Sequence, residues 1–449
     1  MKQLLYLGFR LVYAIKAWLS RRLTVAGRSV LAGMLGCAVL GIDTNRTMAY
    51  MGFTLLLAML LTSAGWCLFF RPRITALRKL PRFATAGDPL SYSVVLENRG
   101  AWRQEGLYLL EDVESPLPTL FEVQQAPEPD GRKRNPFDRS IGYHRWTWLL
   151  SRKQVARSTE QPLAGLPSDE PQQLRLELLP LRRGRLRFKG LSLVCPDPLG
   201  LFKARAYLPG AASLLVLPRR YLLPPLQLPG ARRYQPGGVS LASSVGDSEE
   251  FLSLRDYRPG DPLRRIHWKS WAKTGRPVVK EYQDEFFVRH ALILDTFQRI
   301  EASEVLEEAV SVAASFVYTI QTQESLLDLM FIGTEAYCFT SGRGLAYVDR
   351  MIEILACVQA CGDKPFPTLL PLVTERAPLL SGTICVLLAW DEERKALVSL
   401  LKKLGLPVLV LVITDRGDKE TMDPGPMKDD PANFHCLRAG RIQEGLSRL

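Results

Sequence analysis

The chain has 449 residues, and its 58 lysines and arginines against 46 acidic residues give a formal net charge of +12. This length allows two or three domains, and the ordinary apolar fraction allows a large core. The eight cysteines are scattered, and the one close pair, Cys357 and Cys361, has neither redox nor zinc spacing. The composition therefore offers no redox or zinc motif and suits a reducing compartment.

Residues 1–80 begin with a basic amphipathic stretch and then contain two apolar segments. The segment 48–70 has 23 residues and no charged side chain, which is long enough for a transmembrane helix. Residues 23–42 are apolar except near their start, where the Arg28 side chain can extend to the lipid headgroups. The link between the segments is too short for a domain, so the sequence predicts a transmembrane hairpin.

Basic residues flank this hairpin on both sides. Five lysines and arginines and no acid precede residue 23, and five more lie between residues 71 and 82, again without an acid. Basic flanks stay in the cytoplasm and suit anionic headgroups. We therefore expect a multi-pass protein of the bacterial inner membrane, with the lipid bilayer as a partner and most of the chain in the cytoplasm. A cleaved signal peptide fits this pattern poorly.

Residues 81–235 have the texture of a β-sandwich, with short strands between prolines and glycines. Residues 124–171 form a polar, basic stretch that is expected to be a long loop. Within it, Tyr143 to Leu150 could be a strand whose alternating tryptophans, Trp146 and Trp148, serve packing. The other expected strands are Leu90–Leu96, Leu174–Leu179, Arg185–Val194 and Ser213–Leu217.

Residues 236–288 form a basic and aromatic crossing segment. Asp261 is expected to cap a short helix that has Pro262 at its first position and ends at Gly275, after which Val278 starts a strand. The helix is expected to bury Leu263, Ile266 and Trp271. The candidate residues for binding a partner or an anion are Tyr257, Asp261, Arg264, His267, Trp268, Lys269, Lys280 and Glu281.

Three interpretations of this segment stay open. Its arginines and lysines, including Arg264 and Arg265, could hold phosphate while Trp268 and Trp271 stack on bases. Asp261 and His267 could instead perform the acid–base chemistry of a hydrolase. In the third interpretation the bases pair with interleaved acids in a structural crossing between domains. The interleaved acids favour the third interpretation, so nucleic acid is not the expected partner.

Residues 289–449 alternate between apolar strands and amphipathic helices. This alternation predicts an α/β domain with a mostly parallel sheet covered on both faces. Asp295, Asp391 and Asp415 each directly follow the end of a predicted strand. Ligands bind at that edge of such sheets, so these acids could hold a divalent cation or cap the following helices. No glycine-rich nucleotide-binding loop is present.

Two motifs carry a resemblance to a known family. RDYRPGDPLRRIHWKSWAKTGRPVVKEYQDE and the upstream RRGRLRFKGLSLVCPDPLGLF resemble the hallmark segments of the domain of unknown function 58 family. The resemblance implies a membrane-anchored, multidomain protein in which a β-sandwich precedes a doubly wound von Willebrand factor A-like domain. The family is often encoded beside MoxR-type AAA+ ATPases and transglutaminase-like membrane proteins, which the resemblance suggests as partners. We therefore expect a non-enzymatic membrane adaptor whose A-like domain binds a partner such as a MoxR-type ATPase.

Von Willebrand factor A-like domains often bind a metal through D-x-S-x-S after the first strand. The matching run here keeps Asp295, but Phe297 and Arg299 replace both serines. Asp391 could supply the later acid of such a site. The resemblance therefore implies no cofactor beyond a weak Mg²⁺ site at Asp295 and Asp391.

Overall fold

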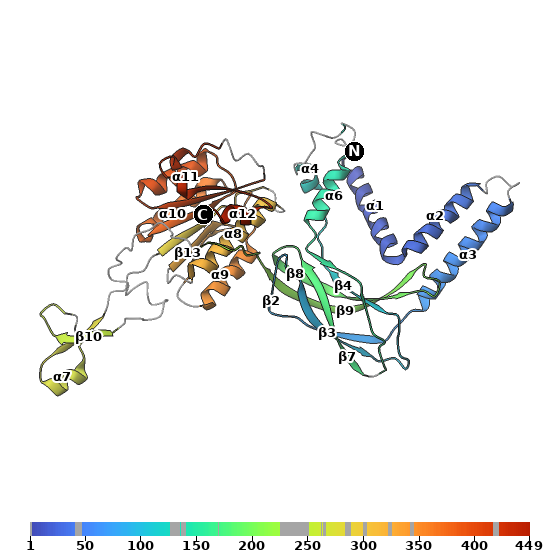
Figure 1. Ribbon diagram of the computed structural model, residues 1–449, viewed down its shortest axis with the longest axis horizontal. Helices are drawn as coiled ribbons and strands as arrows, with labels where there is room; N and C mark the ends of the chain where they lie inside the picture. Colours follow the sequence, from blue (N-terminus) through green and yellow to red (C-terminus); the bar gives the residue numbers. More distant parts are fainter. Residues whose placement is uncertain are drawn as a thin grey trace. The chain divides into compact units, whose positions relative to one another are not determined.

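The computed structural model describes residues 2–40, 47–125, 135, 141–168, 170–224, 251–261, 263, 266–282, 289–299, 303–321, 326–341, 345–415 and 422–449. They form two compact units. The first comprises residues 1–219 with 300–303, and the second comprises residues 220–299 with 304–449. The first unit contains three N-terminal helices and two β-sheets, and the second contains a six-stranded sheet covered by helices and a separate two-stranded hairpin (Figure 1).

The chain starts with three helices, α1 (Lys2–Arg22), α2 (Val25–Leu40) and α3 (Thr47–Phe69) (Figure 1). The last two pack side by side, and small residues allow this: Gly52 lies against Cys37 and Gly33 against Leu56. Among the described residues, α3 is the one helix long and apolar enough to cross a bilayer, whereas α2 has 16 residues. The predicted apolar segments are therefore confirmed as a helix pair.

The junction between α1 and α2 is seated on a loop of the β region. Thr24 donates its backbone N–H to the carbonyl of Leu201 at 3.0 Å and its hydroxyl to the carbonyl of Gly200 at 2.6 Å. A Cβ on Gly27 would lie 2.0 Å from the Leu201 oxygen, so this close approach requires glycine. The buried Asp197 carboxylate closes the loop by accepting from the N–H of Phe202 at 2.6 Å. The D-P-x-G-L-F motif thus forms the seat of the apolar helix pair.

Two sheets form the β region of the first unit. One has the strand order β1-β3-β7-β5 and the other β2-β9-β8-β4-β6, and side chains from both fill one core. Strand β3 alternates between buried and half-buried positions along its length, which directs every second side chain to that core. The bounds are β1 Ile74–Lys79, β2 Phe83–Thr85, β3 Leu90–Asn98, β4 Tyr108–Val113, β5 Ala156–Ser158, β6 Gln161–Pro162, β7 Pro171–Pro180, β8 Gly184–Pro196 and β9 Lys203–Leu217.

Strand β1 places one of the basic residues that follow α3 inside the β region. It pairs with β3 along its whole length and carries Arg78 into the core, where Arg78 Nη2 lies 2.5 Å from Glu111 Oε1. Tyr92 donates its hydroxyl to the other Glu111 oxygen at 2.5 Å. Burial raises the pKa of Glu111 to about 7, against the lowering effects of the Tyr92 and Arg78 hydrogen bonds. Arg78 is therefore a core residue and not a headgroup contact, and a boundary at residue 80 would cut through the β region.

The expected long loop of residues 124–171 contains regular structure. Helix α4 (Leu120–Gln125) extends into its start, and α6 (Tyr143–Arg152) replaces the possible strand at Tyr143–Leu150. Trp146 and Leu149 are buried on one side of α6, and Trp146 packs edge-on against Tyr6 of α1 at 5.5 Å. The alternating tryptophans suggested a strand, but this stretch is a helix whose Trp146 packs against α1.

The α/β part of the second unit confirms the predicted alternation. Its sheet has the order β14-β13-β12-β15-β16-β17, and every pairing is parallel except that of β14 with β13. The strands are β12 Arg289–Leu294, β13 Leu326–Ile332, β14 Ala336–Ser341, β15 Gly382–Leu387, β16 Val408–Thr414 and β17 Phe434–Arg438. The helices are α8 Glu304–Gln321, α9 Leu345–Cys357, α10 Leu369–Arg376, α11 Glu392–Lys403 and α12 Ile442–Leu446, with 3₁₀ helices at Phe366–Thr368, Ala377–Leu379, Gly425–Met427 and Pro431–Asn433.

The chain enters the second unit near residue 220. The backbone N–H of Tyr221 donates to Ser315 Oγ at 2.8 Å, and its hydroxyl donates to Glu308 at 2.5 Å, both on α8. Leu222 exchanges two hydrogen bonds with the Gln443 side chain on α12. The sandwich region thus ends earlier than residue 235, and the expected boundary itself lies outside the described residues.

Candidate functional site

The basic and aromatic segment folds as a small hairpin. Strands β10 (Phe251–Asp256) and β11 (Val278–Tyr282) pair antiparallel, and the short helix α7 (Trp268–Thr274) lies between them in the sequence (Figure 1). Ile266 forms a bridge with Val279, and both side chains are buried. The strand expected after Gly275 is confirmed, and so is the helix end at this glycine, whose φ of 68° is the left-handed conformation.

Asp261 holds the turn after β10. Its carboxylate accepts two hydrogen bonds from the Arg255 guanidinium, at 2.7 and 2.8 Å, and a third from the backbone N–H of Arg258 at 2.9 Å. The Arg255 bonds, followed by the Arg258 bond, lower the pKa of Asp261 to about 2. The predicted role of Asp261 as helix cap is therefore wrong, because α7 begins seven residues later and Asp261 closes an ion-paired turn instead.

His267 stands at the start of α7 and is oriented by its own helix. Its Nδ1 lies 2.6 Å from Ser270 Oγ, and its backbone N–H donates to the carbonyl of Val278 at 2.8 Å. The Asp261 carboxylate bonds to Arg255 and Arg258, and His267 Nδ1 bonds to Ser270, so no hydrogen bond joins Asp261 to His267. These two residues therefore do not form an acid–base pair.

The exposed side chains of the hairpin include aromatic and cationic residues. Trp268 is 63% exposed and stacks on Trp271, with ring centroids 5.2 Å apart and planes 19° from parallel. Leu263, expected to be buried, is exposed, whereas Ile266 is buried as expected. Arg258, Lys269, Lys273 and Arg276 are also exposed, and Tyr257 and Lys280 are half-buried. Arg264, Arg265 and the side chain of Glu281 lie outside the described residues, so the phosphate-holding arginines have no structural description.

The carboxyl edge of the α/β sheet holds the two acids of the predicted metal site. Asp295 directly follows β12 and is fully buried; its Oδ1 accepts from the N–H of Phe297 and its Oδ2 from the N–H of Leu388, each at 3.0 Å. Asp391 caps α11 by accepting from the N–H of Arg394 at 3.0 Å. Backbone N–H groups of two loops thus fix the Asp295 carboxylate, and the first turn of α11 fixes the Asp391 carboxylate.

Arg394, which the sequence patterns did not single out, links these two acids. Its Nε lies 2.6 Å from Asp295 Oδ2, and its Nη1 donates to Asp391. The guanidinium also stacks 4.7 Å over the ring of Phe366. Burial lowers the pKa of Arg394, but the two carboxylate partners raise it by more, so the pKa of Arg394 is raised overall. A fixed cation therefore occupies the position between Asp295 and Asp391, where a metal ion was the candidate.

Other potential ligands at this edge are used or point elsewhere. The Thr296 hydroxyl donates to the carbonyl of Ile332, and Arg299 is exposed. Asp415 is also exposed at the end of β16. Among the described residues, no group of three or more histidine, cysteine, aspartate or glutamate side chains is arranged to hold a metal. A signal in the sequence was the spacing Asp391-x-x-Arg394, which places both side chains on the first turn of one helix.

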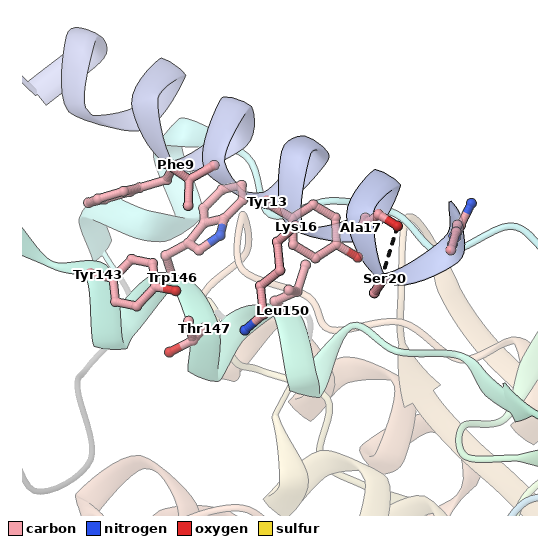
Figure 2. Close-up of a pocket in the computed structure, with 11 residues that line it drawn as sticks. Phe9, Tyr13, Lys16, Ala17, Ser20, Tyr143, Trp146, Thr147 and Leu150 are labelled. Atoms are coloured by element: carbon pink, nitrogen blue, oxygen red, sulfur yellow. Dashed lines mark hydrogen bonds between the residues drawn. The ribbon is translucent and has the colours of Figure 1, made fainter. Parts of the chain in front are cut away.

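A cavity of about 310 Å³ lies between α1 and α6. Figure 2 shows Phe9, Tyr13 and Lys16 of α1 facing Tyr143 and Trp146 of α6. The residues that line it include no carboxylate, histidine or cysteine. This cavity is a space within the packing of α1 against the β region and offers no acid–base pair for catalysis.

Comparisons with known proteins bear on the hairpin and the first half of the α/β sheet. Residues 253–377 match the family model described as Protein of unknown function DUF58. This match supports the assignment of the segment to the DUF58 family. The DUF58 match runs from β10 through Asp295 to the end of α10, so the hairpin and the first sheet strands form one family segment.

A curated relative and two solved structures are similar to parts of the chain. The uncharacterized protein YeaD of Bacillus subtilis (strain 168) is 28% identical over 193 residues, 42% of this chain and 46% of YeaD, so the match spans less than half of that relative. The CARDB domain of PF1109 from Pyrococcus furiosus, solved with di-metal ions, shares 12% identity over 33% of this chain and 96% of its own, with a TM-score of 0.17. A β-glucosidase from Listeria innocua shares 9% identity over 32% of this chain and 16% of its own, with a TM-score of 0.16.

Proposed function

We propose that this DUF58 protein is a non-enzymatic, membrane-anchored adaptor that binds a partner protein in the cytoplasm. Its first candidate partner is a MoxR-type AAA+ ATPase, and its second is a transglutaminase-like membrane protein. The observation that carries the proposal is the Arg394 guanidinium between Asp295 and Asp391. A filled cation position leaves this sheet edge as a surface for protein contacts, with no requirement for a metal.

The topology of the six-stranded sheet supports a von Willebrand factor A-like domain. Numbered in chain order within the sheet, its strands follow the order 3-2-1-4-5-6, which is a doubly wound arrangement. Ligands of such sheets bind where the strand order reverses, here between β12 and β15. Asp295 follows β12 and accepts from Leu388, the residue after β15, so the ion pair of Asp295 with Arg394 lies at this reversal.

The exposed aromatic and cationic side chains of the hairpin favour an acidic segment of a partner protein as the ligand. Exposed tryptophans and arginines contribute strongly to protein interfaces, and the exposed lysines of α7 add positive charge. Trp268 already stacks on Trp271, which favours one rigid aromatic anchor over two separate platforms for nucleic-acid bases. Asp261 and His267 each have a structural hydrogen-bond partner, which disfavours the hydrolase alternative.

The helix pair α2–α3 and its basic flank support an anchor in the bacterial inner membrane. In this proposal α2 and α3 cross the bilayer, and both ends of the pair face the cytoplasm. A reporter enzyme fused after Leu449 should then be active only when its type functions in the cytoplasm. Activity confined to a periplasmic reporter would reverse the topology.

The adaptor proposal is tested with the full chain in lipid nanodiscs and a purified MoxR-type ATPase from the same bacterium. We expect saturable binding that Trp268→Ala with Lys269→Glu weakens about tenfold or more, since a central aromatic anchor is lost. Lys403→Glu, an exposed charge reversal at the end of α11, is the matched control and should leave the affinity unchanged.

Two results would count against the adaptor. Equal binding by the hairpin variant and the control would remove the hairpin from the interface. Capture of DNA or RNA that is lost steeply with added salt, together with no capture of the ATPase, would favour the nucleic-acid alternative.

A further inference from the structure

Helix α1 has two faces with different environments. Phe9 and Tyr13 face α6 (Figure 2). The rings of Tyr6 and Trp146 lie 5.5 Å apart, and those of Phe9 and Tyr143 lie 5.6 Å apart. The Tyr6 hydroxyl also donates to the carbonyl of Pro118 at 3.1 Å. These contacts fix the rotation of α1 about its own axis, so the direction of its opposite face is determined.

The opposite face of α1 is an apolar stripe. Its members recur at spacings of three and four residues, which aligns them along one side of a helix. Their side chains are between 49% and 75% exposed in the first unit. The residues of this stripe are Leu4, Leu7, Leu11, Ile15 and Trp18.

The charge of α1 and its continuity with α2 indicate what covers this stripe. Residues 2–22 contain five lysines and arginines and no acid, the composition of helices that lie on anionic lipid. Helix α1 ends at the seat on Leu201, and the apolar helix α2 begins at Val25. Trp18, near this junction, is the type of side chain that gathers at the membrane–water interface.

We propose that α1 lies in the plane of the membrane, with its apolar stripe in the interface of an anionic lipid leaflet. The inference rests on the bilayer anchor of the proposed function. It adds that α1 is a second membrane contact, and that α6 and the Leu201 seat hold the β region against the bilayer surface through α1. A second copy of the chain or another protein on the stripe is the competing occupant.

The test places the photocrosslinking residue p-benzoylphenylalanine in the full chain, reconstituted in nanodiscs of phosphatidylethanolamine and phosphatidylglycerol. Leu11 reports the stripe, and Phe9 on the opposite face of the same helix is the matched control. Leu61, which is exposed on α3, reports the anchor separately. Adducts are identified by mass spectrometry after irradiation.

We expect lipid adducts at Leu11 at a yield comparable with that at Leu61, and adducts at Phe9 only within the chain. The Leu11 yield should fall when phosphatidylcholine replaces the anionic lipid. Lipid adducts at Leu61 without any at Leu11, or a Leu11 crosslink to a second copy, would overturn the inference. Lipid adducts at Leu11 without any at Leu61 would support it and remove the spanning anchor from the proposed function.

Discussion

The sandwich region and the α/β region both bury an arginine side chain against carboxylates, but in different places. Arg78 lies in the core and joins β1 of one sheet to Glu111 on β4 of the other. Arg394 lies at the carboxyl edge of a sheet and joins the first turn of α11 to Asp295 at the end of β12. The first arginine thus connects two layers, and the second fills a position where doubly wound sheets bind ligands.

This difference teaches how to interpret a buried arginine. A buried ion pair is weak evidence for stability, because desolvation offsets much of the attraction, yet removal of one partner leaves an uncompensated charge. The loss of Arg78 should therefore appear as a loss of folding. The loss of Arg394 should appear both as a loss of stability and as a new capacity to bind cations.

The largest expected effect separates two truncations. A fragment of residues 71–449 keeps β1 and Arg78 and should be soluble and monodisperse, whereas a fragment of residues 81–449 loses both and should aggregate. The physical reason is that deletion of β1 exposes β3 as an edge and leaves the buried Glu111 without its arginine. Size-exclusion chromatography of the two fragments measures this. Equal solubility of both would show that β1 is dispensable.

Arg394→Ala should lower the stability of the α/β region by about 3 to 5 kcal/mol, because Asp295 is left buried without its partner. Millimolar Mn²⁺ should then restore part of the melting temperature, while the wild-type protein should show no submillimolar binding of Mg²⁺ or Mn²⁺ by calorimetry. Arg394→Lys keeps the charge and should be less destabilised and insensitive to Mn²⁺. Tight Mg²⁺ binding by the wild-type chain that Asp295→Ala abolishes would contradict the assignment of Arg394 as the resident cation.

The protonation of Glu111 should give the sandwich region a pH-dependent stability. Its folded-state pKa of about 7 is above the ordinary 4.5, so the folded chain holds the proton more tightly. The stabilisation is complete below pH 4.5 and is lost as the pH rises through 7. The melting temperature of this region should therefore decrease as the pH rises from 4.5 to 7, and Glu111→Gln should flatten this pH dependence. An unchanged slope in the variant would assign it to other groups.

The smallest effect is expected at the half-buried pair of Arg255 and Asp261. Asp261→Asn should raise amide exchange in residues 251–282 without changing the melting temperature of the two larger regions. Because the folded-state pKa of Asp261 is lowered from 3.8 to about 2, the contribution of the pair is present above pH 3.8 and lost as the pH falls through 2. Exchange in the hairpin that is unchanged by the substitution would show that the turn holds without its ion pair.

Patterns local in sequence predicted much of the fold. The apolar segments 23–42 and 48–70 became α2 and α3, and the alternation of strands and helices predicted for residues 289–449 is present, because each element depends on its own periodicity. Gly275 could be identified because a left-handed helix end favours glycine. Tyr143–Leu150 could not, since a ten-residue helix packed on α1 satisfies its tryptophans as well as a strand would.

The sequence by itself determined where apolar helices, strands and amphipathic helices lie, because the period of apolar residues belongs to each segment alone. The tertiary structure decided what the charged residues do. Arg78 is 33 residues from Glu111, and Arg394 is 99 residues from Asp295, so neither pair can be recognised from spacing. A guanidinium beside a lipid headgroup, in a core or in a cation position has the same local pattern, and only the folded neighbours distinguish these three environments.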